Sequence, residues 1–192
     1  MRQAEKNSRS REQIVACAFA EFAENGFAGG SVNRICARGG ISKGLLYHYY
    51  SGREELYLAC VEKLFADMTD ALTDALGSGE VTVESYFAAR AGFFAAHPQH
   101  RALFGDLLLY PQSALAPEVN RRRAKFDELN SSVLRAVLSR EKLSPGITPD
   151  GAVEQLHIFV DFLGVSLRES GGDFEEKAAA LLHTMLYGLI AR

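Results

Sequence analysis

The sequence predicts an all-α protein with an N-terminal three-helix head, a connecting fourth helix and a C-terminal helical bundle as its body. Three observations predict this class. Apolar residues recur at spacings of three and four along nearly the whole chain, and no alternating strand pattern occurs. The five prolines all fall where this helical periodicity is interrupted. The composition, 47% hydrophobic and 23% charged, is typical of an ordinary folded domain.

The first helix of the head is predicted to begin at Ser10, whose hydroxyl can cap it while Gln13 reaches back. It ends at Asn25-Gly26, because glycine accepts the left-handed conformation that closes many helices. A second helix covers about 31–38 and is followed by a tight glycine turn.

The third helix is predicted to begin after Ser42, which caps it, and to end near Tyr49. Ser51 and Glu54 form a capping box that opens the fourth helix. That helix carries a strict four-residue apolar step: Leu56, Cys60, Leu64, Met68, Leu72 and Leu76. Such a stripe drifts by about 40° per step around a helix of 3.6 residues per turn. The fourth helix is therefore expected to contact the head at its start and the body at its end.

The body is predicted to contain helices near 81–97, 101–110, 118–140, 151–169 and 173–191. The last two are apolar on two sides, and a terminal pair of this kind usually finds its second partner in another subunit. We therefore expect these two helices to form a dimer interface. Burial of both faces within a single core is the alternative.

Charge is distributed unevenly along the chain. Residues 1–53 carry eight Lys and Arg against four Asp and Glu, whereas residues 54–192 carry thirteen against twenty. A basic head on an acidic body is expected when only one end approaches a polyanion.

Two further features concern the compartment. The chain has no apolar run of about 18 residues and no apolar signal peptide, so a cytoplasmic protein without membrane contact is expected. Its three cysteines, Cys17, Cys36 and Cys60, fit buried thiols in a reducing cytosol, with a redox switch as the alternative.

Two short helices joined by a glycine turn in a basic head are typical of a helix-turn-helix. Residues 10–57 resemble the DNA-binding domain of the TetR family of regulators. The core of this resemblance is Gly-Ile-Ser-Lys-Gly-Leu-Leu-Tyr-His-Tyr-Tyr at 40–50, followed by Arg-Glu-Glu-Leu at 53–56. The rest of the chain is similar to the family's effector-binding and dimerisation domain in its helical layout. The sequence departs from the family pattern at Gly30 and Gly39, where Thr and Ala are common, and at Tyr50 and Arg53, where Phe and Lys are common.

This comparison divides the chain into a DNA-binding domain, residues 1–52 with a flexible basic arm at 1–9, and an effector-binding and dimerisation domain, residues 53–192. Side chains at helix N-termini, phenols and guanidinium groups can bind phosphates, while the exposed face of the third helix can reach base edges. The predicted DNA contacts are Ser31, Ser42, Tyr47 and Arg53 for phosphates, and Lys43, Gly44, Leu45 and His48 for bases.

The resemblance also implies a pocket among the body helices, whose aromatic residues are interleaved with a few polar ones. Aromatic residues at helical spacing are more often core than ligand site. A pocket of this composition would suit a small lipophilic or aromatic effector. The predicted lining residues are Phe87, Arg90, Phe94, Phe104, Tyr110, Phe126, Asn130 and His157.

Catalytic and metal chemistry are not predicted. The sequence lacks a phosphate-binding glycine loop, a nucleophile elbow and paired catalytic carboxylates. His157 with Asp161, and His97 with His100, each supply two potential ligands, too few to complete a metal site. No cofactor is therefore expected.

The predicted function is a sequence-specific transcriptional regulator, a ligand-responsive repressor that binds a palindromic operator as a homodimer. One alternative is an activator or architectural DNA-binding protein without an effector. The alternative from another class is a ligand-binding or catalytic helical protein whose head has lost its DNA-binding role.

Overall fold

The computed structural model describes residues 2–77, 80–166, 180–181 and 183–185 of the chain. Every element that it describes is a helix. The helices are α1 (Arg2–Gly29), α2 (Val32–Gly39), α3 (Lys43–Tyr49), α4 (Arg53–Leu76), α5 (Val83–Ala96), α6 (Pro98–Leu109), the short 3₁₀ helix η1 (Ser113–Leu115), α7 (Ala116–Leu138) and α8 (Pro149–Ser166).

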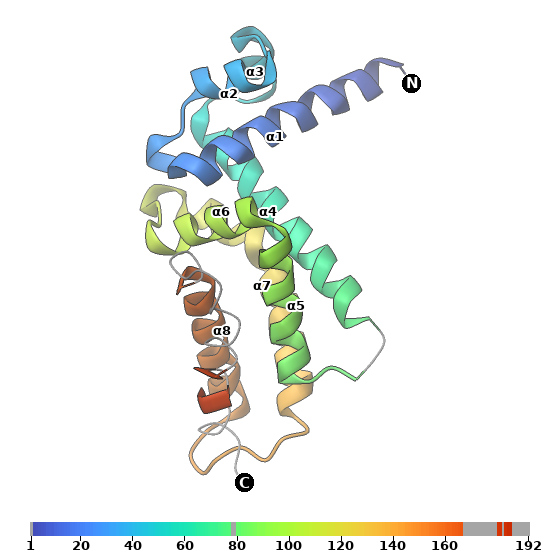
Figure 1. Ribbon diagram of the computed structural model, residues 1–192, viewed down its shortest axis with the longest axis vertical. Coiled ribbons are helices and arrows are strands. Elements are labelled where there is room, and N and C mark those ends of the chain that lie inside the picture. The colour runs from blue at the N-terminus through green and yellow to red at the C-terminus, as the bar shows by residue number, and fades with distance from the viewer. Residues whose placement is uncertain (1, 78–79, 167–179, 182, 186–192) are drawn as a thin grey trace.

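Helices α1, α2 and α3 form a head at one end of the molecule, and α4 runs from the head into the body (Figure 1). Helix α6 lies across the junction and packs against α1, while α5, α7 and α8 extend away from the head (Figure 1). The predicted all-α architecture is confirmed. Most of the final helix expected at 173–191 lies outside the described residues.

The start of α1 differs from the prediction. The helix begins at Arg2 rather than at Ser10, so the flexible arm expected at 1–9 is helical from residue 2 onward. Good helix formers at positions 2–6 allow this extension, and the Ser8 hydroxyl donates to Glu12 Oε1 at 2.7 Å. The side chain of Gln13 does not reach back toward Ser10 but donates from Nε2 to the carbonyl of Gly39 at 2.9 Å.

A kink at Gly26 interrupts α1 near the predicted end of the helix. Gly26 adopts φ 66° and ψ 178°, and its positive φ favours glycine. A Cβ built at this position would lie 2.5 Å from Asp106 Oδ1 of α6. The kink therefore depends on glycine both for its backbone conformation and for the close approach of the body.

The remaining caps are local. Ser42 caps α3 as predicted, and Thr82 with Ser85 forms a capping box at the start of α5. The capping box expected from Ser51 and Glu54 is wrong. Gly52 is the N-cap of α4 without a side-chain bond, and the Ser51 N–H donates instead to Glu55 Oε2 at 2.6 Å.

The predicted stripe of α4 packs as expected. Leu56, Cys60, Leu64, Met68 and Leu72 are buried in one apolar cluster that includes residues of α1 to α7. Leu76 packs instead against a second cluster, formed by α5, α7 and α8. The α4 helix thus contacts the head at its start and the lower body at its end.

The three cysteines form no disulfide: Cys36 and Cys60 are buried and Cys17 is half-buried. Burial raises the pKa of the Cys60 thiol and that of Cys17, which keeps both protonated and unreactive. None of the described helices has the length and apolar character needed to cross a bilayer.

Candidate functional site

The exposed face of α3 gathers the predicted base contacts. Leu46 points into the core and is fully buried, which fixes the orientation of this short helix. The opposite side chains are exposed: Lys43, Gly44, Leu45, Tyr47 and His48. Leu45 and Tyr47 are 38% and 52% exposed, so both side chains are accessible to a partner. A helix with this face outward can enter a groove of matching width.

The turn before α3 holds it at a defined angle to α2. Gly40 ends α2 in the left-handed conformation, with φ 60° and ψ 31°. The Ile41 N–H donates to the carbonyl of Cys36 at 2.9 Å, and the Ile41 side chain is buried. Ser42 Oγ then accepts the N–H of Leu45 at 3.1 Å. These hydrogen bonds and the buried Ile41 side chain hold α3 in a fixed position relative to α2.

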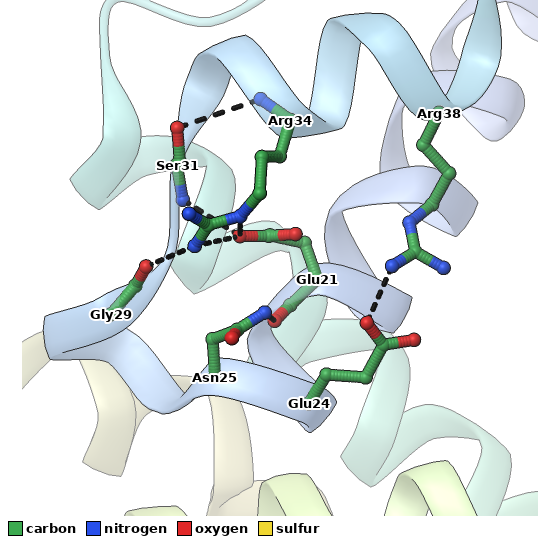
Figure 2. A network of polar contacts seen from close by, with 7 residues as sticks. All are labelled: Glu21, Glu24, Asn25, Gly29, Ser31, Arg34 and Arg38. Atoms are coloured by element: carbon green, nitrogen blue, oxygen red, sulfur yellow. Dashed lines mark hydrogen bonds and ion pairs between the residues drawn. The ribbon is translucent and has the colours of Figure 1, made fainter.

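A buried carboxylate on α1 fastens α2 to the rest of the head (Figure 2). Glu21 is 1% exposed, and its Oε1 accepts the Ser31 N–H at 3.1 Å and Arg34 Nε at 2.7 Å. Arg34 Nη2 also donates to the Gly29 carbonyl at 2.5 Å. This network was not among the predicted features, although Glu21 stands out in the sequence as a glutamate within an otherwise apolar stretch of α1.

This network changes the interpretation of Ser31. Its N–H, expected to be open to a phosphate, is already donated to Glu21, and its hydroxyl accepts the Arg34 N–H at 3.5 Å. A phosphate at this helix end must therefore be bound through the hydroxyl or through the N–H groups that follow it. The Ser31 contact remains a prediction.

Loss of the Glu21 carboxylate is expected to destabilise the head. In a Glu21→Ala variant the half-buried Ser31 N–H loses its acceptor and Arg34 loses one of its two partners, at a cost of about 2 kcal/mol of unfolding free energy. Urea unfolding would measure it. The matched control is Glu24→Ala, which breaks the exposed pair with Arg38 and should cost much less, because exposed ion pairs contribute little to stability. Equal effects of the two substitutions would contradict the assigned role of Glu21.

Arg53, a predicted phosphate contact, is the first residue of α4 and is half-buried. Its guanidinium carbon lies 4.5 Å from the ring centroid of Phe27, within the range of a cation–π contact. Stacking on this ring restricts the side chain while leaving the planar charge able to pair with a phosphate.

The two departures from the family pattern that introduce glycine in the head have a steric explanation. A Cβ at Gly30 would lie 2.5 Å from Phe22 Cδ1, and a Cβ at Gly39 would lie 2.5 Å from Ile41 Cδ1. Both glycines thus permit closer packing than a larger residue would allow.

The predicted ligand residues converge in the body around Arg90 of α5. Arg90 Nη1 donates to the Tyr86 hydroxyl at 3.2 Å, and that hydroxyl donates to Asn130 Oδ1 at 2.6 Å. The Arg90 guanidinium carbon lies 5.3 Å from the ring centroid of Phe126 and 5.8 Å from that of Phe104. Arg90, Asn130, Phe104 and Phe126 thus lie in one cluster, and their role in binding a ligand stays a prediction.

The other predicted ligand residues lie at the periphery or outside this cluster. Phe94 contacts Phe104 with 5.2 Å between ring centroids, and Phe87 contacts Phe159 of α8 at 6.1 Å. Tyr110 is 60% exposed at the end of α6 and lies outside the cluster. The surface recess lined by Val81, Ser132, Val133, Ala136, Val137 and Arg140 contains none of the predicted ligand residues.

Helix α8 contributes polar groups to the same cluster. Asp161 Oδ1 lies 3.6 Å from Arg90 Nη2, and Asp161 Oδ2 lies 3.4 Å from Arg123 Nη2. Burial lowers the pKa of His157, which Arg90 lowers further and Asp161 partly restores, so this imidazole is neutral near pH 7. Sequence reasoning considered Asp161 only as a metal ligand and did not place Arg123 here.

The pair of His97 and His100, considered as metal ligands, has other partners. His100 Nε2 lies 2.7 Å from Asp67 Oδ2, and His97 Nδ1 lies 2.9 Å from the Phe93 carbonyl. Within the described part of the chain, no group of three His, Cys, Asp or Glu side chains could hold a metal ion.

The helical head with an outward α3 defines a DNA-binding regulator of the helix-turn-helix class, and comparisons with known proteins identify the family. The sequence model described as "Bacterial regulatory proteins, tetR family" matches residues 14–60. The transcriptional repressor AcnR of Corynebacterium glutamicum is 31% identical over 167 residues, which cover 82% of this chain and 79% of AcnR. The chain belongs to the TetR family of bacterial regulatory proteins.

Other relatives match more locally or in fold alone. The transcriptional repressor SCO4008 of Streptomyces coelicolor is 31% identical over 114 residues, which are 59% of this chain and 57% of that protein. The transcriptional regulator FadR of Bacillus subtilis, solved in complex with stearoyl-CoA, superposes with a TM-score of 0.76 at 15% identity. That match covers 92% of this chain and 98% of FadR. The protein is therefore a transcriptional regulator that binds DNA, as predicted, and its family is one of regulators rather than enzymes.

Proposed function

We propose that the protein is a homodimeric repressor that binds a palindromic operator and is released by a small effector held in its body. The observation that carries this proposal is the face of α3, with Lys43, Tyr47 and His48 exposed around a fully buried Leu46. Relatives named as repressors, AcnR among them, support the sign of regulation. Such a protein acts in the cytoplasm, where bacterial DNA lies.

In the proposed interface, some side chains contact phosphates and others contact bases, according to their chemistry. The side chains of Ser31, Ser42, Tyr47 and Arg53 bind phosphates and fix the register on the duplex. Lys43 suits guanine acceptors, Leu45 a thymine methyl group, and Gly44 lets the backbone approach the bases, with His48 beside them. Residues 1–52 form the DNA-binding domain, and residues 53–192 form the effector-binding and dimerisation domain.

A two-fold dimer would present two α3 helices to successive major grooves, roughly 34–36 Å apart. Support comes from α8, where Ile158 and Phe162 are 64% and 62% exposed. Leu181, which follows in the chain, is 49% exposed. Large apolar side chains at such exposures suit a subunit interface better than contact with water.

The test is a fluorescence-anisotropy titration with the DNA upstream of the protein's own gene. Tyr47→Ala and His48→Ala are each expected to weaken binding by about tenfold or more, because they remove a phosphate and a base contact. Tyr110→Ala, which removes a similarly exposed tyrosine far from α3, should leave the affinity unchanged.

Salt dependence provides a second readout. Arg53→Ala is expected to reduce the slope of log affinity against log salt by about 1, because Arg53 is the cationic side chain assigned to a phosphate. The proposed interface would be refuted if the affinity of the wild type for DNA did not depend on salt. It would also be refuted if Tyr47→Ala and His48→Ala both bound DNA with wild-type affinity.

A further inference from the structure

Arg90 is an unusual residue for the interior of a helical body. Its side chain is 5% exposed and lies between the rings of Phe104 and Phe126, both of which are fully buried. A guanidinium in such surroundings is costly unless its charge and its donors are matched by partners. The donors of Arg90 are matched only in part.

Two of its three nitrogens lack hydrogen bonds. Nη1 donates to Tyr86, but Nε and Nη2 have no hydrogen-bond partner among the residues that the structure describes. The nearest opposite charge is Asp161 Oδ1, 3.6 Å from Nη2, which is an ion pair but not a hydrogen bond. Asp161 is also shared with Arg123, whose Nε lies 2.9 Å from Asp127 Oδ2.

The geometry of the unmatched atoms is specific. Nε and Nη2 are the two nitrogens on one edge of a guanidinium, and their N–H bonds point in parallel, as a carboxylate requires for a bidentate pair. His157 Nε2, from α8, is likewise buried and has no hydrogen-bond partner in the described part of the chain. Two donors of α5 are thus available in this polar cluster, and α8 adds a third in the His157 tautomer that is protonated at Nε2.

We infer that the effector is a small organic monocarboxylate, whose carboxylate binds the Nε and Nη2 edge of Arg90 and whose apolar part lies among the aromatic rings of the body. This inference rests on the proposed effector-binding role of the body. A single negative charge is favoured over a phosphate dianion, because Asp161 stands beside Arg90, and the neighbouring cation Arg123 is already paired with Asp161 and Asp127.

Binding would leave the acidic side chains of the cluster paired. When the effector takes the edge of Arg90, Asp161 can keep its contact with Arg123 across α7 and α8. Arg90 therefore exchanges its long ion pair with Asp161 for a bidentate pair with the ligand, and every carboxylate keeps a cationic partner. Because Asp161 belongs to α8 and Arg90 to α5, the exchange alters the contact between these two helices.

The experiment is a thermal-shift titration of the full chain with matched acid and amide probes: benzoate and benzamide, phenylacetate and phenylacetamide, and octanoate and octanamide. At least one acid is expected to raise Tm by roughly 5 °C at about a hundredfold excess over its Kd. Its amide, which has nearly the same shape without the charge, should give no comparable shift.

Variants of Arg90 test whether the thermal shift arises from binding at this residue. Arg90→Met should abolish the shift, and Arg90→Lys, which keeps the charge without the parallel donors, should weaken binding by about tenfold. Arg140→Met removes an exposed arginine near the end of the same body and should respond as wild type. Arg90→Met without probe is expected to be at least as stable as wild type, since it removes a buried charge that is incompletely paired.

An amide that acts as well as its acid, a set of acids that all leave Tm unchanged, or an undiminished shift in both Arg90 variants would overturn the inference. The DNA titration is scored separately. Loss of DNA binding with retained carboxylate binding would refute the proposed repressor function and not the ligand class.

Discussion

An Ile158→Glu variant is expected to elute as a monomer and to bind operator DNA about a hundredfold more weakly than the wild type. Ile158 is 64% exposed on α8, next to the equally exposed Phe162 one turn further along. A carboxylate in the middle of an apolar interface must lose its hydration without gaining a partner, which opposes association.

The effect on DNA follows from the loss of linkage between two half-sites. Two heads held in one dimer bind the second half-site at a high effective concentration, and this advantage amounts to about 10² or more in affinity. Size-exclusion chromatography with light scattering measures the first effect, and anisotropy measures the second.

The control for this variant is Leu109→Glu, which places the same charge on another exposed apolar residue. Leu109 is 45% exposed and is the last residue of α6, outside the apolar face of α8. It should remain dimeric with wild-type affinity. An Ile158→Glu protein that stays dimeric and binds DNA normally would show that this face of α8 is not the subunit contact.

Replacement of Asp106 by alanine is expected to cost about 2–3 kcal/mol of unfolding free energy. Asp106 lies on α6, 8% exposed, and its Oδ2 accepts the backbone N–H of Phe27 at 3.1 Å. The same oxygen accepts the Tyr57 hydroxyl of α4 at 3.4 Å. Removal of the carboxylate therefore leaves a buried backbone donor unpaired directly after the Gly26 kink.

Tyr57→Phe serves as the matched control because it removes only the weaker of the two bonds. Its expected cost is about 0.5 kcal/mol, at the low end for a net hydrogen bond. Burial, and to a lesser degree the Asp106 charge, raises the pKa of Tyr57, so the phenol stays protonated and can donate across the working range of pH. An Asp106→Ala protein that unfolds at the wild-type urea concentration would contradict this role.

The parts of the head that could be predicted from sequence depend on short-range signals. Ser42 caps a helix whose bonded N–H is three residues away, and Gly40 closes a turn within its own neighbourhood. The start of α1 was predicted at Ser10 from a good cap, but favourable helix formers before it extend the helix to Arg2. A capping residue marks a position where a helix can begin. Whether the helix begins there depends on the helix propensity of the residues that precede the cap.

Long-range polar contacts could not be predicted in the same way. Glu21 and Arg34 lie on different helices, and Asp106 meets Phe27 across 79 positions of sequence. The Arg90 cluster was anticipated as polar residues among aromatic ones, which is a compositional signal. The exposed position of Tyr110, in contrast, follows from where α6 ends, and composition carries no information about that.

The apolar cluster that runs from α1 through α7 without a break bears on how such proteins can be recombined. The proposed boundary at residues 52 and 53 separates the DNA-binding domain from the effector-binding and dimerisation domain. The core does not follow this boundary, because Leu56 and Phe104 belong to the same apolar cluster as Ile14 and Leu46. An isolated fragment of residues 1–52 would expose much of that core to water and should not hold its recognition surface in shape. A chimaera that exchanges heads between relatives should therefore carry along the first half of α4 and the facing side of α6, or it will exchange DNA specificity only at the expense of folding.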